Sequence, residues 1–191
     1  MSKKNILILC LVILFAGIAL RFVYTRTILW VEQEIYVQER PVHAYFNQIE
    51  NQYQRRIDLI KYLASCSKVY AKNPNVDIEM QALSVTADSL AGIIIDPYDL
   101  TSLHQYAAAQ NKLFKRSCTS INMVEDLYPE LKSDTIFKSC YKQLIETKSC
   151  ILNEQNLYNK EIKMYNAKIN KFPFCLLRNK EFQMWTTCFN D

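Results

Sequence analysis

The sequence predicts an all-α protein, in which an N-terminal transmembrane helix is followed by an antiparallel up-and-down four-helix bundle with long helices. Only two of the 191 residues are glycine, and half of the residues are apolar. Folds rich in β-structure need glycine at their turns, so this composition disfavours them. After the N-terminal region, apolar residues recur at alternating steps of three and four, which is the period of one helix face.

The N-terminal region is predicted to be a membrane anchor. Residues 6–20 are fifteen consecutive apolar residues, and Arg21 follows them. An arginine can extend its charged end to the membrane interface, so the span can reach Tyr24 and approach the roughly 20 residues that a bilayer requires. We therefore expect residues 1–24 to be an anchor that contacts the lipid bilayer through residues 6–24.

A cleaved signal peptide is the alternative for the same region. Lys3 and Lys4 would be its basic start, and residues 17–19 would be its cleavage site. Basic residues are nearly balanced on the two sides of the apolar segment, so the side of the membrane that carries the remaining chain is left open.

Four helical segments are predicted after the anchor. Pro41 can occupy the first turn of a helix, Asp99 can cap the third helix, and Ser133 or Asp134 can cap the fourth. The segments cover about 41–72, about 76–93, the residues between Asp99 and Pro129, and the residues from Ser133 or Asp134 to Phe172. The apolar face of the second segment is expected to consist of Val76, Met80, Leu83, Ala87 and Leu90, and the same spacing places Lys148 on the apolar face of the last segment.

The predicted domains follow from these segments. Residues 25–40 are expected to be a juxtamembrane stalk, and residues 41–173 form the bundle. Residues 174–191 form an apolar tail, which either packs on the bundle or presents a contact surface through Phe182, Met184, Trp185 and Phe189.

The stretch NQYQRRIDLIKYL, residues 51–63, places two arginines in the first helix. Arg56 falls on the apolar face, and a buried guanidinium needs a carboxylate partner. Counting residues along the antiparallel helices predicts that Arg56 holds the helix register in a polar layer, while Arg55 faces solvent or pairs with Asp58. The expected members of the layer are Gln52, Gln155 and Asp88. An exposed arginine and a functional anion site are the alternatives.

Residues for metal or covalent chemistry are scarce in this sequence. None of the seven cysteines forms a C-x-x-C pair, and neither His43 nor His104 follows a glutamate by three positions. Basic and acidic residues are interleaved along the chain, which disfavours nucleic-acid binding. We expect no metal, no cofactor, no nucleic-acid partner and no catalytic residues.

Three ordered stretches resemble motifs of the LemA family: NQYQRRIDLI at 51–60, YPELKSDTIFKSCYKQL at 128–144 and LYNKEIKMYNAKINKFP at 157–173. The resemblance covers about 41–173 and implies a membrane-tethered four-helix bundle with no established enzymatic activity. Lys148, Ser149 and Gln155 depart from the family pattern. The residues that carry the family motifs are Tyr128, Pro129, Tyr158, Asn159, Tyr165, Asn166, Phe172 and Pro173.

These features predict a non-enzymatic single-pass protein of the bacterial cell membrane. Its bundle would act in protein–protein interaction, as a scaffold or adaptor for a partner that the sequence does not name. A membrane-remodelling or lipid-associated protein is one alternative, and an enzyme with an unrecognised site inside the bundle is another. Glu32, Glu34 and Glu39 dilute the basic residues beside the anchor, which weakens the lipid alternative.

We predict that the N-terminal segment stays attached, because its length approaches a bilayer span. The intact mass of the protein purified from membranes tests this. An N-terminus near Leu20 would instead identify a signal peptide.

Overall fold

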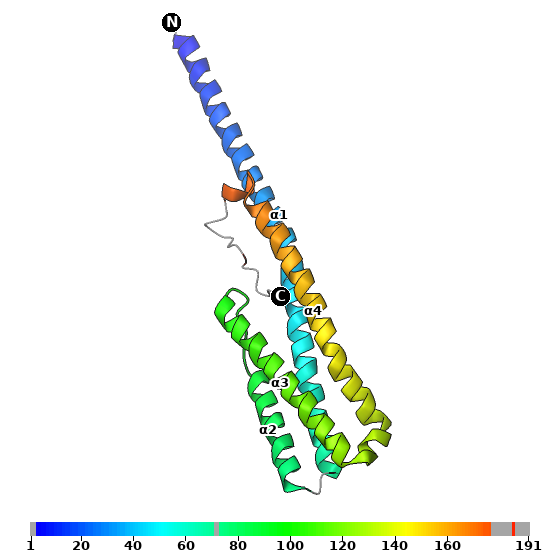
Figure 1. Cartoon of the computed structure of the whole chain (residues 1–191). Coiled ribbons are helices and arrows are strands. Elements are labelled where there is room, and N and C mark those ends of the chain that lie inside the picture. Colours follow the sequence, from blue (N-terminus) through cyan, green and yellow to red (C-terminus); the bar gives the residue numbers. More distant parts are fainter. Residues whose placement is uncertain (1–2, 71–72, 177–184, 186–191) are drawn as a thin grey trace. The chain divides into compact units, whose positions relative to one another are not determined.

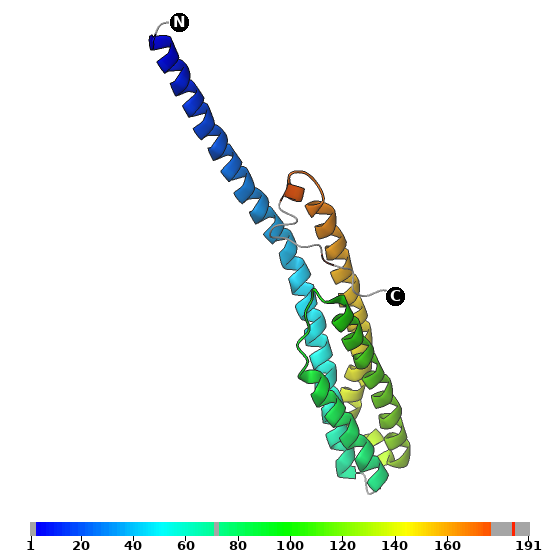
Figure 2. The same cartoon turned by 90° about the vertical axis from the view of Figure 1, so that its left-hand side faces the viewer.

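A computed structural model shows the chain as a set of helices (Figures 1 and 2). The structure describes residues 3–70, 73–176 and 185, and no strand occurs among them. The predicted all-α class is therefore confirmed. The elements are α1 (Lys3–Tyr70), α2 (Pro74–Ala91), α3 (Leu100–Leu127), the 3-10 helix η1 (Pro129–Ser133), α4 (Thr135–Ile169) and the 3-10 helix η2 (Phe174–Leu176).

The chain divides into two compact units. The first contains residues 1–41 and 164–184, and the second contains residues 42–163 and 185–191. Helices α1 and α4 each contribute to both units. Within the second unit, α2, α3 and the corresponding parts of α1 and α4 lie side by side, and successive helices run in opposite directions (Figures 1 and 2). This unit is the predicted up-and-down bundle.

The core of the bundle follows the predicted helix faces. Every buried residue of α2 lies on the predicted stripe, which consists of Val76, Met80, Leu83, Ala87 and Leu90. The other three helices also bury apolar side chains. These include Ile49, Ile57, Ile60 and Leu63 of α1, Leu103, Leu113, Ile121 and Val124 of α3, and Phe137, Leu144 and Ile151 of α4. Burial of these stripes is the main stabilising contribution, because helix propensity alone rarely holds helices in water.

Short polar side chains define where the bundle helices begin. Asn73 caps α2, where its side chain accepts a hydrogen bond of 2.9 Å from the Asn75 amide. Asp99 caps α3 by accepting from two amides, as predicted. At the start of α4, Asp134 accepts from the amides of Ile136 and Phe137 at 2.8 and 3.1 Å. Asp134 is therefore the residue that satisfies the free amides of this helix end.

The first and last helices differ from the prediction at one end each. Residues 25–40 are helical, and Pro41 lies inside α1 rather than at its start. An internal proline costs roughly 3 kcal/mol, because it removes one hydrogen bond and crowds the preceding turn. Burial of Val31 and Ile35 before it, and of Val42 after it, favours continuation of the helix. Helix α4 ends at Ile169, and Phe172 beyond it is 79% exposed.

The first unit carries the apolar N-terminal segment. Among the described residues, α1 is the one helix that is long and apolar enough to cross a membrane. The large apolar side chains described between Ile6 and Tyr24 are 48–70% exposed, so they are not buried in a protein core. Further along the unit, Lys168 Nζ forms an ion pair with Glu34 Oε1 at 2.6 Å, and the rings of Trp30 and Phe174 lie 5.8 Å apart.

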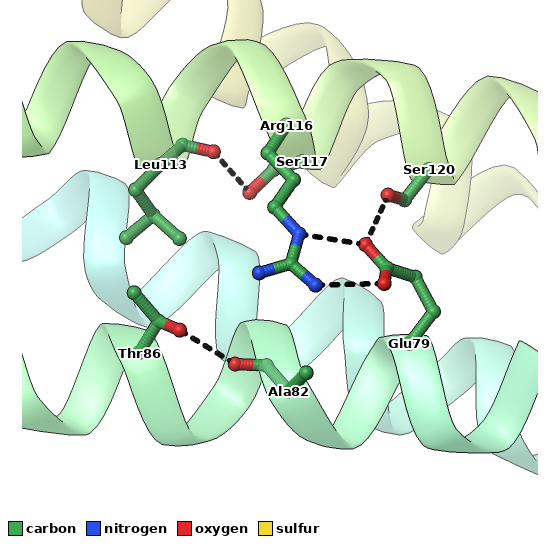
Figure 3. A network of polar contacts seen from close by, with 7 residues as sticks. All are labelled: Glu79, Ala82, Thr86, Leu113, Arg116, Ser117 and Ser120. Atoms are coloured by element: carbon green, nitrogen blue, oxygen red, sulfur yellow. Dashed lines mark hydrogen bonds and ion pairs between the residues drawn. The ribbon is translucent and has the colours of Figure 1, made fainter.

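A charged contact joins α2 to α3 on the bundle surface (Figure 3). Arg116 Nε and Nη2 donate to the two carboxylate oxygens of Glu79 at 2.8 and 2.7 Å, and Ser120 Oγ donates to Glu79 at 2.8 Å. The hydrogen bonds from Arg116 hold the pKa of the Glu79 carboxyl below its ordinary value. Two parallel hydrogen bonds fix the relative register of α2 and α3 more specifically than a single contact.

Leu83→Ala should lower the free energy of unfolding by about 2–5 kcal/mol, because Leu83 is 1% exposed and its loss leaves a cavity. Val85→Ala on the same helix should change it by less than about 0.5 kcal/mol, because Val85 is 58% exposed. Denaturant unfolding in mild detergent, followed by circular dichroism, measures both. Equal losses from the two variants would contradict the assigned core face of α2.

Candidate functional site

Arg56 lies at the centre of the bundle. It is 1% exposed and is the largest of the fully buried side chains described. Its Nε donates to Thr147 Oγ1 of α4 at 3.1 Å, and the Thr147 hydroxyl donates in turn to the Leu144 carbonyl at 2.6 Å. The guanidinium carbon lies 4.6 Å from the centre of the Phe114 ring of α3 and 5.7 Å from that of Tyr53. This buried position agrees with the prediction that Arg56 enters the core.

The predicted carboxylate partner of Arg56 is absent from this layer. Asp88 pairs instead with Lys61 Nζ at 2.5 Å, and its side chain is 56% exposed. The neighbouring Ala87 occupies the buried position of α2, which turns Asp88 outward. Placing Asp88 in the polar layer was therefore wrong. Among the residues that the structure describes, Arg56 Nη1 has no hydrogen-bond partner.

Two tyrosines complete the layer around Arg56. Gln155 Nε2 donates to the Tyr53 hydroxyl at 3.1 Å, and Gln110 Nε2 donates to the Tyr106 hydroxyl at 2.8 Å. The rings of Tyr53 and Tyr106 meet edge to face, with centres 5.4 Å apart. Gln155 thus belongs to the layer, as predicted, but it bonds to a tyrosine beside the arginine.

No described carboxylate pairs with Arg56. Burial raises the pKa of Tyr53 to about 12, although Arg56 opposes the change. Burial also raises the pKa of the neighbouring Tyr106, and the charge of Glu50 raises it further. Burial likewise raises the pKa of the Cys118 thiol above its ordinary value. All three groups are therefore neutral near pH 7. Burial lowers the pKa of Arg56, yet a guanidinium stays protonated in proteins, so the layer carries a net positive charge.

The arginine lines a cavity between α1, α3 and α4 with a volume of about 300 Å³. Two further cations, Lys115 and Lys148, line it as well, and no aspartate or glutamate does. Two amide side chains and three apolar side chains form the remaining walls, which are Asn111, Gln155, Phe114, Ile151 and Leu152. The cationic side chains can attract an anionic group, and the apolar side chains can contact the rest of the same molecule.

The other predicted polar residues lie outside direct contact with the Arg56 guanidinium. Arg55 is exposed, as predicted, but its Nη2 donates to Gln143 Oε1 of α4 at 3.0 Å. Asp58, the alternative partner considered for Arg55, accepts a hydrogen bond of 3.0 Å from Gln54 Nε2. Gln52 is half-buried, and its Oε1 has no partner within the described part of the chain.

Sequence reasoning did not assign several described members to the site, which are Tyr53, Tyr106, Gln110, Asn111, Phe114, Lys115 and Thr147. It placed Lys148 on the apolar face of the last helix, whereas Thr147 occupies the buried position and Lys148 is exposed. A threonine beside a lysine in the stripe was the available signal, because burying a hydroxyl that can bond within its own helix costs less than burying an ammonium group.

The family-motif residues occupy several places. Tyr158 is buried, and its ring centre lies 6.0 Å from that of Phe46 and 6.3 Å from that of Trp185. Tyr128 accepts a hydrogen bond of 3.1 Å from the Asn73 amide, and Pro129 begins η1. In the first unit, Tyr165 is buried. Of the remaining motif residues, Asn159, Asn166 and Pro173 are half-buried, and Phe172 is exposed.

The tail contributes one described residue to the bundle. Trp185 is 2% exposed, and its ring lies 4.5 Å from that of Tyr98 and 4.8 Å from that of His43. At this position, therefore, the tail packs on the bundle. Phe182, Met184 and Phe189 lie outside the described residues.

Residues 45–185 match the LemA family, a range that includes all three sequence motifs and the cavity of Arg56. The chain belongs to the LemA family. No curated protein matches the chain. In this LemA-family bundle, Lys148 and Gln155 both line the cavity. Within the described ranges, no three histidine, cysteine, aspartate or glutamate side chains gather as a metal site.

Arg56→Met should leave the unfolding temperature unchanged or raise it, because methionine fills similar space and removes a buried charge that no carboxylate balances. Arg55→Met, on the exposed neighbour, is the matched control and should have little effect. Thermal unfolding in mild detergent measures both variants. A loss of about 3–5 kcal/mol for Arg56→Met alone would show instead that the arginine serves as the structural register residue predicted from the sequence.

Proposed function

We propose that this LemA-family chain is a single-pass protein of the bacterial cell membrane, and that its helical bundle acts without catalysis by binding a protein partner. Support for the membrane anchor comes from the exposed apolar side chains of residues 6–24 on the one described helix that could span a bilayer. Family membership and the helical fold are consistent with a membrane-associated protein.

The observation that carries the interaction role is the outward face of α2. Ile78 and Val85 are 64% and 58% exposed, and they lie seven residues apart, on the side opposite the buried stripe. The segment after α2 adds Ile94, which is 96% exposed. Apolar residues at a spacing of seven are typical anchors for a helix that docks against a groove of another protein.

The two alternative functions have less support. A membrane-remodelling surface would need a basic cluster beside the anchor, where Glu32, Glu34 and Glu39 lie. An enzyme would need a nucleophile, or an acid and a base, in the Arg56 cavity. The described lining supplies an arginine, two lysines, two amide side chains and three apolar residues. Binding therefore fits the lining better than a reaction.

Site-specific photocrosslinking in intact cells tests the interaction role. A photoreactive residue at Val85 of the full chain should yield a discrete crosslinked protein, because this position lies on the proposed contact face. Ile78→Glu should abolish that product and leave the amount of folded protein unchanged, since Ile78 is exposed.

Asn153, an exposed polar residue of α4, is the matched control position. It should give little of the same product. The same crosslinks from Val85 and Asn153, or only lipid adducts from Val85, would contradict a protein partner on α2.

A further inference from the structure

We propose that the cavity of Arg56 is a binding site for a small organic anion, whose carboxylate or phosphate group contacts the arginine and whose compact apolar body lies against the cavity wall. The site belongs to the described bundle and is independent of the outward face of α2.

The charge of the site is the first argument. Arg56, Lys115 and Lys148 line one cavity, and none of its described lining residues is acidic. Neither lysine forms an ion pair with any described residue, whereas Arg116, next to Lys115 in the chain, is paired with Glu79. Three cations around about 300 Å³ with no acidic lining residue create a strongly positive field, which an anion would neutralise.

The unused hydrogen-bonding capacity of Arg56 is the second argument. The side chain is 1% exposed, and its Nε already donates to the Thr147 hydroxyl. Nη1 is buried and has no partner within the described chain, and Arg56 is one of the residues that line the cavity. A buried donor without a partner costs free energy, and a bound water, ion or ligand group can supply the missing acceptor. Carboxylate and phosphate groups match the planar donors of a guanidinium.

The walls of the cavity define the rest of the ligand. Phe114 is half-buried and Ile151 is buried. Leu152 is exposed and extends the apolar surface toward solvent. Asn111 and Gln155 add amide groups that can orient a polar substituent. A volume of about 300 Å³ lies at the lower end of ligand-binding pockets, which favours a compact body over a long acyl chain.

Equilibrium binding to the full chain in a neutral detergent tests the proposal, with phenyl phosphate and benzoate as organic anions, inorganic phosphate as the free anion and benzyl alcohol as the neutral analogue. Isothermal titration and the unfolding temperature are the two readouts. At least one organic anion should bind and raise the unfolding temperature. Inorganic phosphate should bind more weakly, and benzyl alcohol should not bind measurably.

Variants assign the binding to this cavity. Arg56→Met should weaken binding of the organic anion by roughly tenfold or more, because a charged hydrogen bond is lost. Arg55→Met, on the exposed neighbour, should leave it unchanged. Lys148→Gln changes an exposed side chain, so it should preserve the fold and still weaken binding several-fold. The Lys148→Gln variant therefore still tests the site if Arg56→Met does not fold.

Three results would overturn the proposal. The first is that neither organic anion binds. The second is that binding is unaffected by both Arg56→Met and Lys148→Gln. The third is that inorganic phosphate binds as tightly as the organic anions, which would show that the apolar walls contribute nothing.

Discussion

The desolvation of the Arg56 guanidinium is the constraint that organises the centre of the bundle. Removing a charge from water costs several kcal/mol, and here no carboxylate offsets this cost. The partial compensation comes from a threonine hydroxyl on α4 and from the aromatic faces of Phe114 and Tyr53. These contacts bring together side chains of α1, α3 and α4 around the one arginine.

The same layer explains why its tyrosines are paired with glutamines. Tyr53 and Tyr106 are buried beside a cation, and each hydroxyl accepts a hydrogen bond from an amide. Amide donors satisfy the hydroxyl groups without introducing a second charge. The tyrosine and glutamine side chains of this layer are neutral, so they do not cancel the positive charge of Arg56 at the cavity.

Two kinds of surface on this chain therefore have different chemistry. The outward face of α2 exposes the apolar side chains of Ile78 and Val85, which suits contact with a protein. The cavity between α1, α3 and α4 is small and cationic, which suits a low-molecular-weight anion. A bundle can carry both, because ligand sites form between facing helices while the outward helix faces remain available.

The sequence by itself determined the helical class, the apolar N-terminal segment, the buried stripe of α2 and the entry of Arg56 into the core, because each depends on the pattern of apolar residues along one helix. It also located the cap at Asp99, which depends on a few consecutive residues. Only the tertiary structure decided the partners of Arg56. Asp88 faces outward because Ala87 takes the buried position, and Thr147 replaces Lys148 at the core. Both outcomes depend on small rotations of one helix against another, and these rotations are set by packing across helices that are distant in sequence.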